Sequence, residues 1–327
     1  MDRVIWKVGR VIDAHSHFRG KEPVPHYYEI LDLAGHDRVC LLGGTAKDSE
    51  TLARKRERPD RFYCFGQVVH HPDQVSRGDG GYLVKQVEAL MAMGYDGLKM
   101  MEGKPQFRKL SATPAPGYVP LALDHRYFEP LWTALEERQT PITLHLADPI
   151  DWWTAPGALY RDGYEPQEEY FRQAIACLER HPRLRINFAH FMYMAPHLDR
   201  LVEWFGRFPN MRVDMAMGDE FLYYLSDDPD RAREFYIRWQ DRILYGTDIS
   251  DHNSLRHGRA KAEILRLFLE TDETFVNIVQ EAMGRPPSKG SNGRLELRGL
   301  HLPQAVLEKV LALNFEAFAG AGRFAGP

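Results

Sequence analysis

The stretch VIDAHSHFRG, residues 11–20, begins as an apolar run and then places Asp13, His15 and His17 at alternate positions. In an extended strand, residues two apart project from the same face, so these three side chains are expected on one side. Two neighbouring imidazoles are costly to bury in an apolar core, but they suit half of a metal site. The stretch therefore predicts a strand that delivers two ligands, and the remaining ligands must come from elsewhere in the chain.

Seven further short runs share the character of this first strand, RVIDAH at 10–15. Each is apolar, rich in β-branched or aromatic residues, and bounded by turn or charged residues. They lie at 38–44, 61–69, 95–101, 141–147, 184–191, 211–217 and 242–248. Helical patterns separate them, for example GGYLVKQVEALMAMGY, RYFEPLWTALEERQ and EEYFRQAIACLERHP. Eight strands, each followed by a helix, predict an α/β fold of the (β/α)₈ (TIM) barrel type.

A doubly wound open sheet is the alternative fold. It usually has fewer strands and a glycine-rich phosphate loop after the first strand, where this chain has AHSHFRG. We find neither a repeat nor an interdomain linker, and expect one barrel domain over residues 1–327. Long loops follow the fourth strand (EGKPQFRKLSATPAPGYVPLALD) and the fifth (DPIDWWTAPGALYRDGYEPQ). RPPSKGSNGR, 285–294, is the best candidate for a mobile loop, and LPQAVLEKVLALNFEAFAG predicts a terminal helix that plugs or flanks the barrel.

Composition excludes several classes of partner. The net charge is only −4, from 42 basic and 46 acidic residues, so neither nucleic acid nor an anionic membrane is expected as a partner. The three cysteines, Cys40, Cys64 and Cys177, lie in apolar surroundings without a CxxC pair, which indicates free thiols in a reducing compartment. No stretch reaches the ~18–20 apolar residues of a membrane helix, and the charged N-terminus lacks a signal-type segment. We expect a cytoplasmic protein with a small-molecule substrate.

Polar residues occupy the carboxyl ends of the predicted strands, where barrels of this type build their active sites. In chain order they are His15, His17, Lys99, His145, His190 and Asp248. A divalent metal explains the set, because zinc takes histidine nitrogens and carboxylate oxygens and leaves one position open for water. The predicted ligands are His15, His17, His145 and Asp248. Asp248 could also take a proton from that water as a general base, and His190 could orient the water or polarise a substrate carbonyl.

Each of these residues has a plainer interpretation. Taken alone, His145 and His190 are typical of satisfied core histidines, and Asp248 is typical of a helix N-cap before SDHNSLRHG. The ordered set at matching strand ends favours the metal site. Lys99 is expected to bind a substrate carboxylate or to pair with Glu102, in preference to being a carboxylated ligand that bridges two metals.

The loops offer further candidates for substrate contact. Trp152 and Trp153, with Tyr160 and Tyr164, form either an aromatic lid or a packed exterior loop. We predict that Lys99, Trp152, Trp153 and His252 contact the substrate. The pair His70 and His71, followed by Pro72, is interpreted as a plain loop.

The motifs together resemble the amidohydrolase superfamily, specifically its amidohydrolase-related (amidohydrolase 2) branch, over most of the chain. The resemblance rests on IDAHSHF, DGLKMM, LHLAD, NFAHFMYMAP, LYGTDISD and the closing helix with Asn314. It implies a metal-dependent (β/α)₈ barrel in which His15, His17, His145 and Asp248 hold one divalent metal, zinc or manganese. It also implies that His190 touches the bound water or the substrate. A homodimer is compatible with the resemblance.

Three functions follow as hypotheses. The first is a metal-dependent hydrolase in which metal-activated water attacks a lactone, ester or amide of a small organic acid. The second is a metal-dependent, non-oxidative decarboxylase (a lyase) of an unsaturated or aromatic acid, similar to aminocarboxymuconate semialdehyde decarboxylase. The third is a catalytically silent barrel that only binds a ligand, against which the presence of all five expected polar residues argues.

Overall fold

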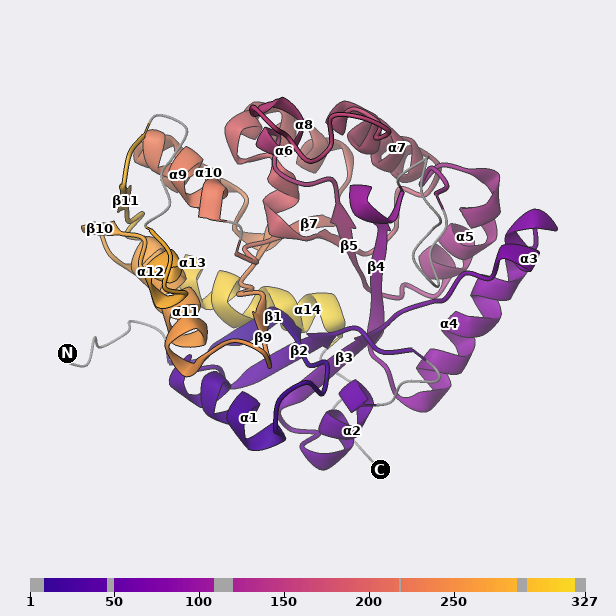
Figure 1. The fold of residues 1–327 in the computed structure, drawn as a ribbon, viewed down its shortest axis with the longest axis horizontal. Helices are drawn as coiled ribbons and strands as arrows, with labels where there is room; N and C mark the ends of the chain where they lie inside the picture. Colours follow the sequence, from indigo (N-terminus) through magenta and orange to yellow (C-terminus); the bar gives the residue numbers. More distant parts are fainter. Residues whose placement is uncertain (1–8, 46–49, 109–119, 218, 287–292, 321–327) are drawn as a thin grey trace.

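A parallel sheet of nine short strands curls inside a ring of helices (Figure 1). The computed structural model describes residues 9–45, 50–108, 120–217, 219–286 and 293–320. The strands are β1 (Ile12–His17), β2 (Arg38–Leu42), β3 (Phe62–Gly66), β4 (Gly97–Gly103), β5 (Ile142–Leu146), β6 (Ile186–Phe188), β7 (Met211–Asp214), β8 (Ile243–Leu244) and β9 (Ile249–Ser250).

The sheet closes through a single segment of chain that supplies both of its last strands. The strand order is β8-β7-β6-β5-β4-β3-β2-β1-β9, with Ile243 paired to β7 and Ile249 paired to β1. Between them, the Tyr245 carbonyl accepts from the Ala14 N–H at 2.9 Å, and the Asp248 N–H donates to the His15 carbonyl at 2.8 Å. The predicted eighth strand at 242–248 is therefore interrupted, yet it completes a barrel. The doubly wound sheet is excluded.

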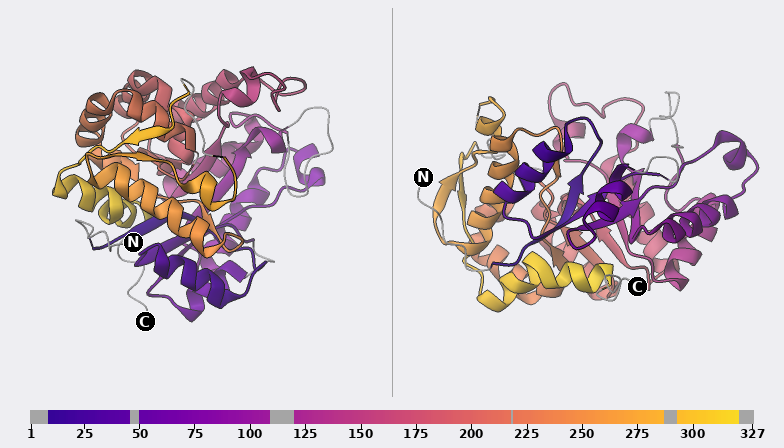
Figure 2. Two further views of the ribbon diagram at one scale, coloured as in Figure 1. Left: turned by 60° about the vertical axis from the view of Figure 1, so that its left-hand side comes forward. Right: turned by 90° about the horizontal axis from the view of Figure 1, so that it is seen from below.

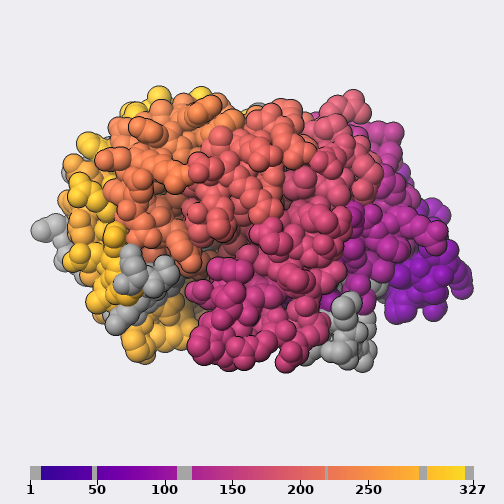
Figure 3. All heavy atoms as spheres, turned by 90° about the horizontal axis from the view of Figure 1, so that it is seen from above, coloured from indigo at the N-terminus to yellow at the C-terminus, as the bar shows by residue number. Residues whose placement is uncertain are grey.

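Helices cover the outside of the barrel (Figure 1), and Figure 3 shows one closely packed face of the molecule. In the described ranges they are α1 (Val24–Leu33), α2 (Glu50–Glu57), α3 (Pro72–Ser76), α4 (Gly81–Met93), α5 (Glu129–Glu137), α6 (Asp151–Thr154), α7 (Gln167–Arg180), α8 (Leu198–Arg207), α9 (Asp219–Asp227), α10 (Pro229–Arg238), α11 (Leu255–Glu270), α12 (Val279–Ala282), α13 (Gln304–Glu308) and α14 (Asn314–Ala319). No helix in these ranges combines the length and the apolar character that crossing a lipid bilayer requires.

Helix α4 illustrates how the sequence sets these elements. Its buried residues Leu83, Val87 and Leu90 are spaced four and three apart, which gives one apolar stripe toward the sheet. The helix ends at Gly94, whose left-handed φ of 102° lets its N–H satisfy a carbonyl of the last turn.

The C-terminal helix closes one end of the barrel. The chain from α13 runs through a π-helical turn (Lys309–Leu313) into α14, and the right-hand view of Figure 2 shows it lying across the strands. Phe315 and Phe318 pack with Tyr63 and Phe65 in a buried cluster of their own. The Asn314 amide donates to the Gln240 and Ile243 carbonyls, at 2.6 and 2.8 Å. The sequence predicted a terminal helix that either plugs or flanks the barrel, and in the structure it plugs one end.

Two predicted loops lie partly outside the described residues. Residues 109–119 of the loop after the fourth strand and residues 287–292 of the predicted mobile loop are among them. Around the second loop, β10 (Thr274–Val276) and β11 (Glu296–Arg298) form an antiparallel pair that the sequence did not suggest.

Three strand ends bend through left-handed backbone that L-residues rarely adopt. Ala147 follows β5 with a φ of 58°, and Asp248 follows β8 with a φ of 54°. After β6, four consecutive residues, His190–Tyr193, all have φ between 54° and 58°. Such a conformation costs roughly 1–2 kcal/mol per residue. These turns redirect the chain at the end of the barrel where the predicted site residues gather.

Gly103 offers a test of how closely two strands approach at that end. A Cβ added at Gly103 would collide with the His145 carbonyl and lie 3.0 Å from Leu146 Cα. We expect Gly103→Ala to destabilise the fold by about 1–3 kcal/mol, because the β5 backbone must move. The matched control is Gly206→Ala in α8, where a Cβ meets nothing within 4 Å. The free energy of unfolding of that variant should rise by about 0.5–1 kcal/mol, because alanine favours the helical backbone more than glycine does. Thermal melts of both variants check the prediction, and equal melting temperatures would contradict it.

Candidate metal centre

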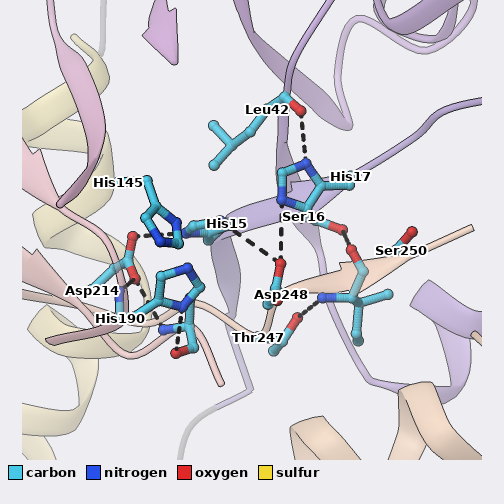
Figure 4. A network of polar contacts seen from close by, with 12 residues as sticks. His15, Ser16, His17, Leu42, His145, His190, Asp214, Thr247, Asp248 and Ser250 are labelled. Atoms are coloured by element: carbon cyan, nitrogen blue, oxygen red, sulfur yellow. Dashed lines mark hydrogen bonds and ion pairs between the residues drawn. The ribbon is translucent and has the colours of Figure 1, made fainter. Parts of the chain in front are cut away.

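Three of the predicted ligands converge at the carboxyl end of the barrel. One ligand atom from each of His15, His17 and Asp248 lies within 4.8 Å of the others, the only such group found in the described part of the chain. The Asp248 Oδ1 atom is 3.2 Å from His17 Nε2 and 3.8 Å from His15 Nε2. Figure 4 shows both rings turned toward this carboxylate. Two nitrogens and one oxygen are a donor set that suits zinc.

The hydrogen bonds of the two imidazoles fix which nitrogen faces the centre. His17 Nδ1 lies 2.8 Å from the Leu42 carbonyl, which can only accept, so Nδ1 carries the proton. His15 Nδ1 likewise donates to the Asp214 carboxylate at 3.0 Å. In a neutral imidazole, Nε2 is then an acceptor on each ring. Three acceptors that face one another repel unless a cation lies between them, so the residues present fit a divalent metal.

The charge states of the cluster agree with this interpretation. Burial, followed by the nearby Lys99 charge, lowers the pKa of His15 and keeps the ring neutral. Burial alone would raise the pKa of Asp248, but nearby positive charge, above all that of Lys261, outweighs it and holds that pKa well below its usual range. A neutral imidazole and an ionised carboxylate are the forms that bind metals.

Simple alternation predicted that Asp13 shares a face with His15 and His17, but in the structure it does not. The register of β1 shifts between Asp13 and Ser16, which breaks the period of two. The Asp13 carboxylate instead accepts from the Thr247 hydroxyl at 2.5 Å and from the His15 N–H at 2.9 Å. It therefore supports the site by joining β1 to the segment that carries Asp248.

Asp214, at the end of β7, is a site residue that the sequence analysis missed. Its fully buried carboxylate accepts from His15 Nδ1, from the Asn187 amide at 2.7 Å, and from the N–H groups of His190 and Ala216 at 2.9 and 3.0 Å. Burial acts to raise the pKa of Asp214, but the His15 ring outweighs it and holds the pKa below its usual value. The rule applied to the other strand ends would have found this residue in MRVDMAM.

His190 begins the left-handed turn after β6 and lines the cavity. Its Nδ1 lies 3.2 Å from the Ala216 carbonyl, which leaves Nε2 as the acceptor. Burial, together with the neighbouring His15, lowers the pKa of His190 to about 3. The ring centroids of His190 and His15 are 5.0 Å apart. The neutral His190 therefore stands beside the centre, where it was predicted to contact water or substrate.

His145, the fourth predicted ligand, lies beside the cluster rather than within it. Its ring centroid is 4.8 Å from that of His190, and its Nε2 is 3.1 Å from Asp148 Oδ1. Asp148 also accepts from the Tyr160 hydroxyl at 2.6 Å, so the loop after β5 is tied to this carboxylate. Because the Nε2–H group of His145 donates to Asp148, Nδ1 is the acceptor nitrogen that remains free to bind a metal. Sequence reasoning missed Asp148, although it stands in the same LHLAD motif.

The cluster lies in a cavity of about 630 Å³, a volume typical of small-molecule sites. Lys99 lines this cavity, is only 2% exposed, and has no hydrogen-bond partner for its ammonium group among the residues that the structure describes. Burial lowers the pKa of Lys99 to about 8, against the opposing charges of Asp214 and Asp248. The alternative pairing with Glu102 is wrong, because Glu102 instead contacts His70 Nε2 at 2.8 Å.

Two of the predicted substrate contacts are not placed on the cavity wall. Trp152 lines the cavity, but Trp153 donates to the Glu165 carbonyl at 2.9 Å and packs against Tyr160. Trp152 therefore faces the cavity, whereas Trp153 belongs to the packed loop. His252 is exposed and lies 2.6 Å from the Ser250 hydroxyl, outside the cavity lining. His70, interpreted as part of a plain loop, is a buried residue paired with Glu102.

Several solved structures have the same fold at low sequence identity. A 2,6-dihydroxybenzoate decarboxylase from Rhizobium is 13% identical, with a TM-score of 0.59 over 96% of this chain and 99% of that one. A dihydroxybenzoic acid decarboxylase from Polaromonas sp. JS666, solved with manganese and 2-nitroresorcinol, is 15% identical, with a TM-score of 0.55 over 95% and 97%. A candidate 2-pyrone-4,6-dicarboxylic acid hydrolase from Pseudomonas putida is 14% identical, with a TM-score of 0.51 over 98% and 100%.

A comparison with family models is more specific. No curated protein matches the chain by sequence. The model described as amidohydrolase matches residues 12–318, from the first residue of β1 into α14. That span contains the converging His15, His17 and Asp248, together with His145 and His190. The chain belongs to the amidohydrolase-2 family.

Proposed function

We propose that this protein is a metal-dependent hydrolase that acts on a lactone, ester or amide of a small organic acid. The observation that supports it most is the convergence of His15 Nε2, His17 Nε2 and the Asp248 carboxylate on one point in the cavity. These residues would hold one divalent cation, and His145 Nδ1 is the fourth candidate ligand. When bound, such a cation supplies Lewis-acid chemistry: it polarises a carbonyl and lowers the pKa of water.

The chain's own residues would orient the reactants. His190 Nε2, neutral and directed by the Ala216 carbonyl, can accept a hydrogen bond from the attacking water. Asp248 accepts the water's proton and returns it to the leaving group. Asp214 holds His15 and the His190 backbone in place through its four hydrogen bonds. Asp248 would thus both bind the cation and transfer the proton, while His190 would orient the water.

Lys99 supports an acid as the substrate. A buried ammonium without a partner is unfavourable, and a carboxylate from the substrate would satisfy it with a charge-assisted hydrogen bond. The two similar enzymes named for a reaction on dihydroxybenzoate or a pyrone dicarboxylate are also named for carboxylic acids.

Decarboxylation is the second candidate, and the same Lys99 favours it. An ammonium beside the centre could hold the carboxylate of an aromatic or unsaturated acid, while Phe107 and Trp152 on the cavity wall offer flat surfaces. Zinc and manganese are both candidates for the cation, and one similar decarboxylase was solved with manganese.

Metal content tests the centre directly. We expect wild-type protein to retain about one zinc or manganese per chain in elemental analysis, and a His15→Ala/His17→Ala double variant to lose it. His252→Ala is the matched control, because its ring lies outside the cavity, and it should keep the metal. Retention of metal by the double variant, with normal folding, would contradict the assigned site.

The reaction class separates the two candidate functions. Metal-loaded protein should hydrolyse members of a panel of lactones, esters and amides, with acid release followed by pH indicator. Asp248→Asn should lower turnover by at least about 100-fold, since it removes both a ligand and the proton acceptor. Release of carbon dioxide from hydroxybenzoates, without hydrolysis of any panel member, would replace the hydrolase proposal by the decarboxylase.

The role of Lys99 has a pH signature. Its pKa of about 8 means that the ammonium is present below that pH and is lost above it. Once a substrate acid is found, kcat/KM should therefore fall as the pH rises through about 8. Lys99→Met should raise KM about 10- to 100-fold at pH 7, as expected for a lost charge-assisted hydrogen bond. Lys99→Arg, which keeps its charge, should shift the fall in kcat/KM to higher pH. An unchanged KM in Lys99→Met would refute carboxylate binding by this residue.

A further inference from the structure

We propose that Lys261 is a positioning residue for the metal centre: its ammonium group holds the Asp248 backbone in the conformation that aims the carboxylate at His15 and His17. The inference rests on the proposed metal site and adds to it a residue that lies outside the cavity.

Lys261 reaches the site from the helix layer. It belongs to α11, which follows β9, and it is only 8% exposed. Its Nζ donates to the main-chain carbonyl of Asp248 at 2.5 Å. Lys261 is not among the residues that line the cavity, so it supports the centre from behind.

Asp248 needs such support because its backbone is strained. Its φ of 54° is in the left-handed region, which costs an L-residue roughly 1–2 kcal/mol. A residue in that conformation persists only when its surroundings hold it there. On one side of the Cα atom, the Asp248 N–H is fixed by the His15 carbonyl at 2.8 Å. On the other side, the carbonyl is fixed by Lys261. Together the two bonds set the direction in which the carboxylate leaves the chain.

Electrostatics alone would predict the opposite role. A positive charge beside a cation site repels the cation, so removal of the charge should tighten metal binding. Removal of a backbone anchor should weaken it, because Asp248 can then relax and withdraw its oxygen. The two explanations therefore predict opposite signs for the same substitution.

The decisive measurement is the affinity for Mn²⁺ and Zn²⁺ at pH 7, by competition with a chromogenic chelator. It compares full-length wild type with Lys261→Met and with Lys99→Met. Lys99 is also a buried lysine near the centre, but its Nζ has no hydrogen bond to any described residue, the Asp248 backbone included. We expect Lys261→Met to bind about 10- to 100-fold more weakly, the usual effect of losing a group that orients a ligand. Lys99→Met, with the same loss of charge, should bind at least as tightly as wild type.

The outcomes separate this inference from the proposed function. If the wild type binds no metal, both fail. If the wild type binds metal and Lys261→Met binds it equally or more tightly, only the positioning role is overturned. Thermal melts without metal show whether each variant folds. Should Lys261→Met not fold, Lys261→Gln carries the test, with weaker binding than wild type as the supporting result and tighter binding as the contrary one.

Discussion

The site depends on one buried carboxylate, that of Asp214. It accepts hydrogen bonds from the His15 ring on β1, from the Asn187 amide on β6, and from the backbone N–H groups of His190 and Ala216. Each of these donors would be costly to bury without an acceptor. The same group thus selects the ring nitrogen with which His15 faces the centre and anchors the turn that carries His190. The strand ends of β1, β6 and β7 meet as one unit because they share this acceptor.

The barrel and the core of the site could be predicted from the sequence. Short apolar runs that alternate with amphipathic helices define a parallel barrel, and parallel strands bring their carboxyl ends to one side. Polar residues at those ends are then neighbours, however far apart they are in the chain. His15 and His17 are in this way predicted to meet Asp248, which lies more than 200 residues later in the chain, and the three converge in the structure.

Other features depend on contacts that no local pattern encodes. The shift of register within β1 turns Asp13 toward Thr247, and alternation alone cannot show it. Adjacent tryptophans look alike in sequence, yet Trp152 lines the cavity while Trp153 is held by the Glu165 carbonyl. The partner of Lys261 is a backbone oxygen, which any residue type supplies. In each case the deciding partner lies on another element.

The left-handed turn His190–Tyr193 links the cavity to the outer helices. Its unfavourable backbone is held by the burial of its middle residues, and the Phe191 ring stacks on Phe221 of α9 and Tyr236 of α10, with centroids 5.6 and 6.2 Å apart. The aromatic residues of that outer layer therefore determine where His190 stands. Over evolutionary time, substitutions in α9 and α10 would be selected for their effect on activity, although those aromatic rings never meet the substrate. A change of specificity could begin there, with every ligand of the centre left untouched.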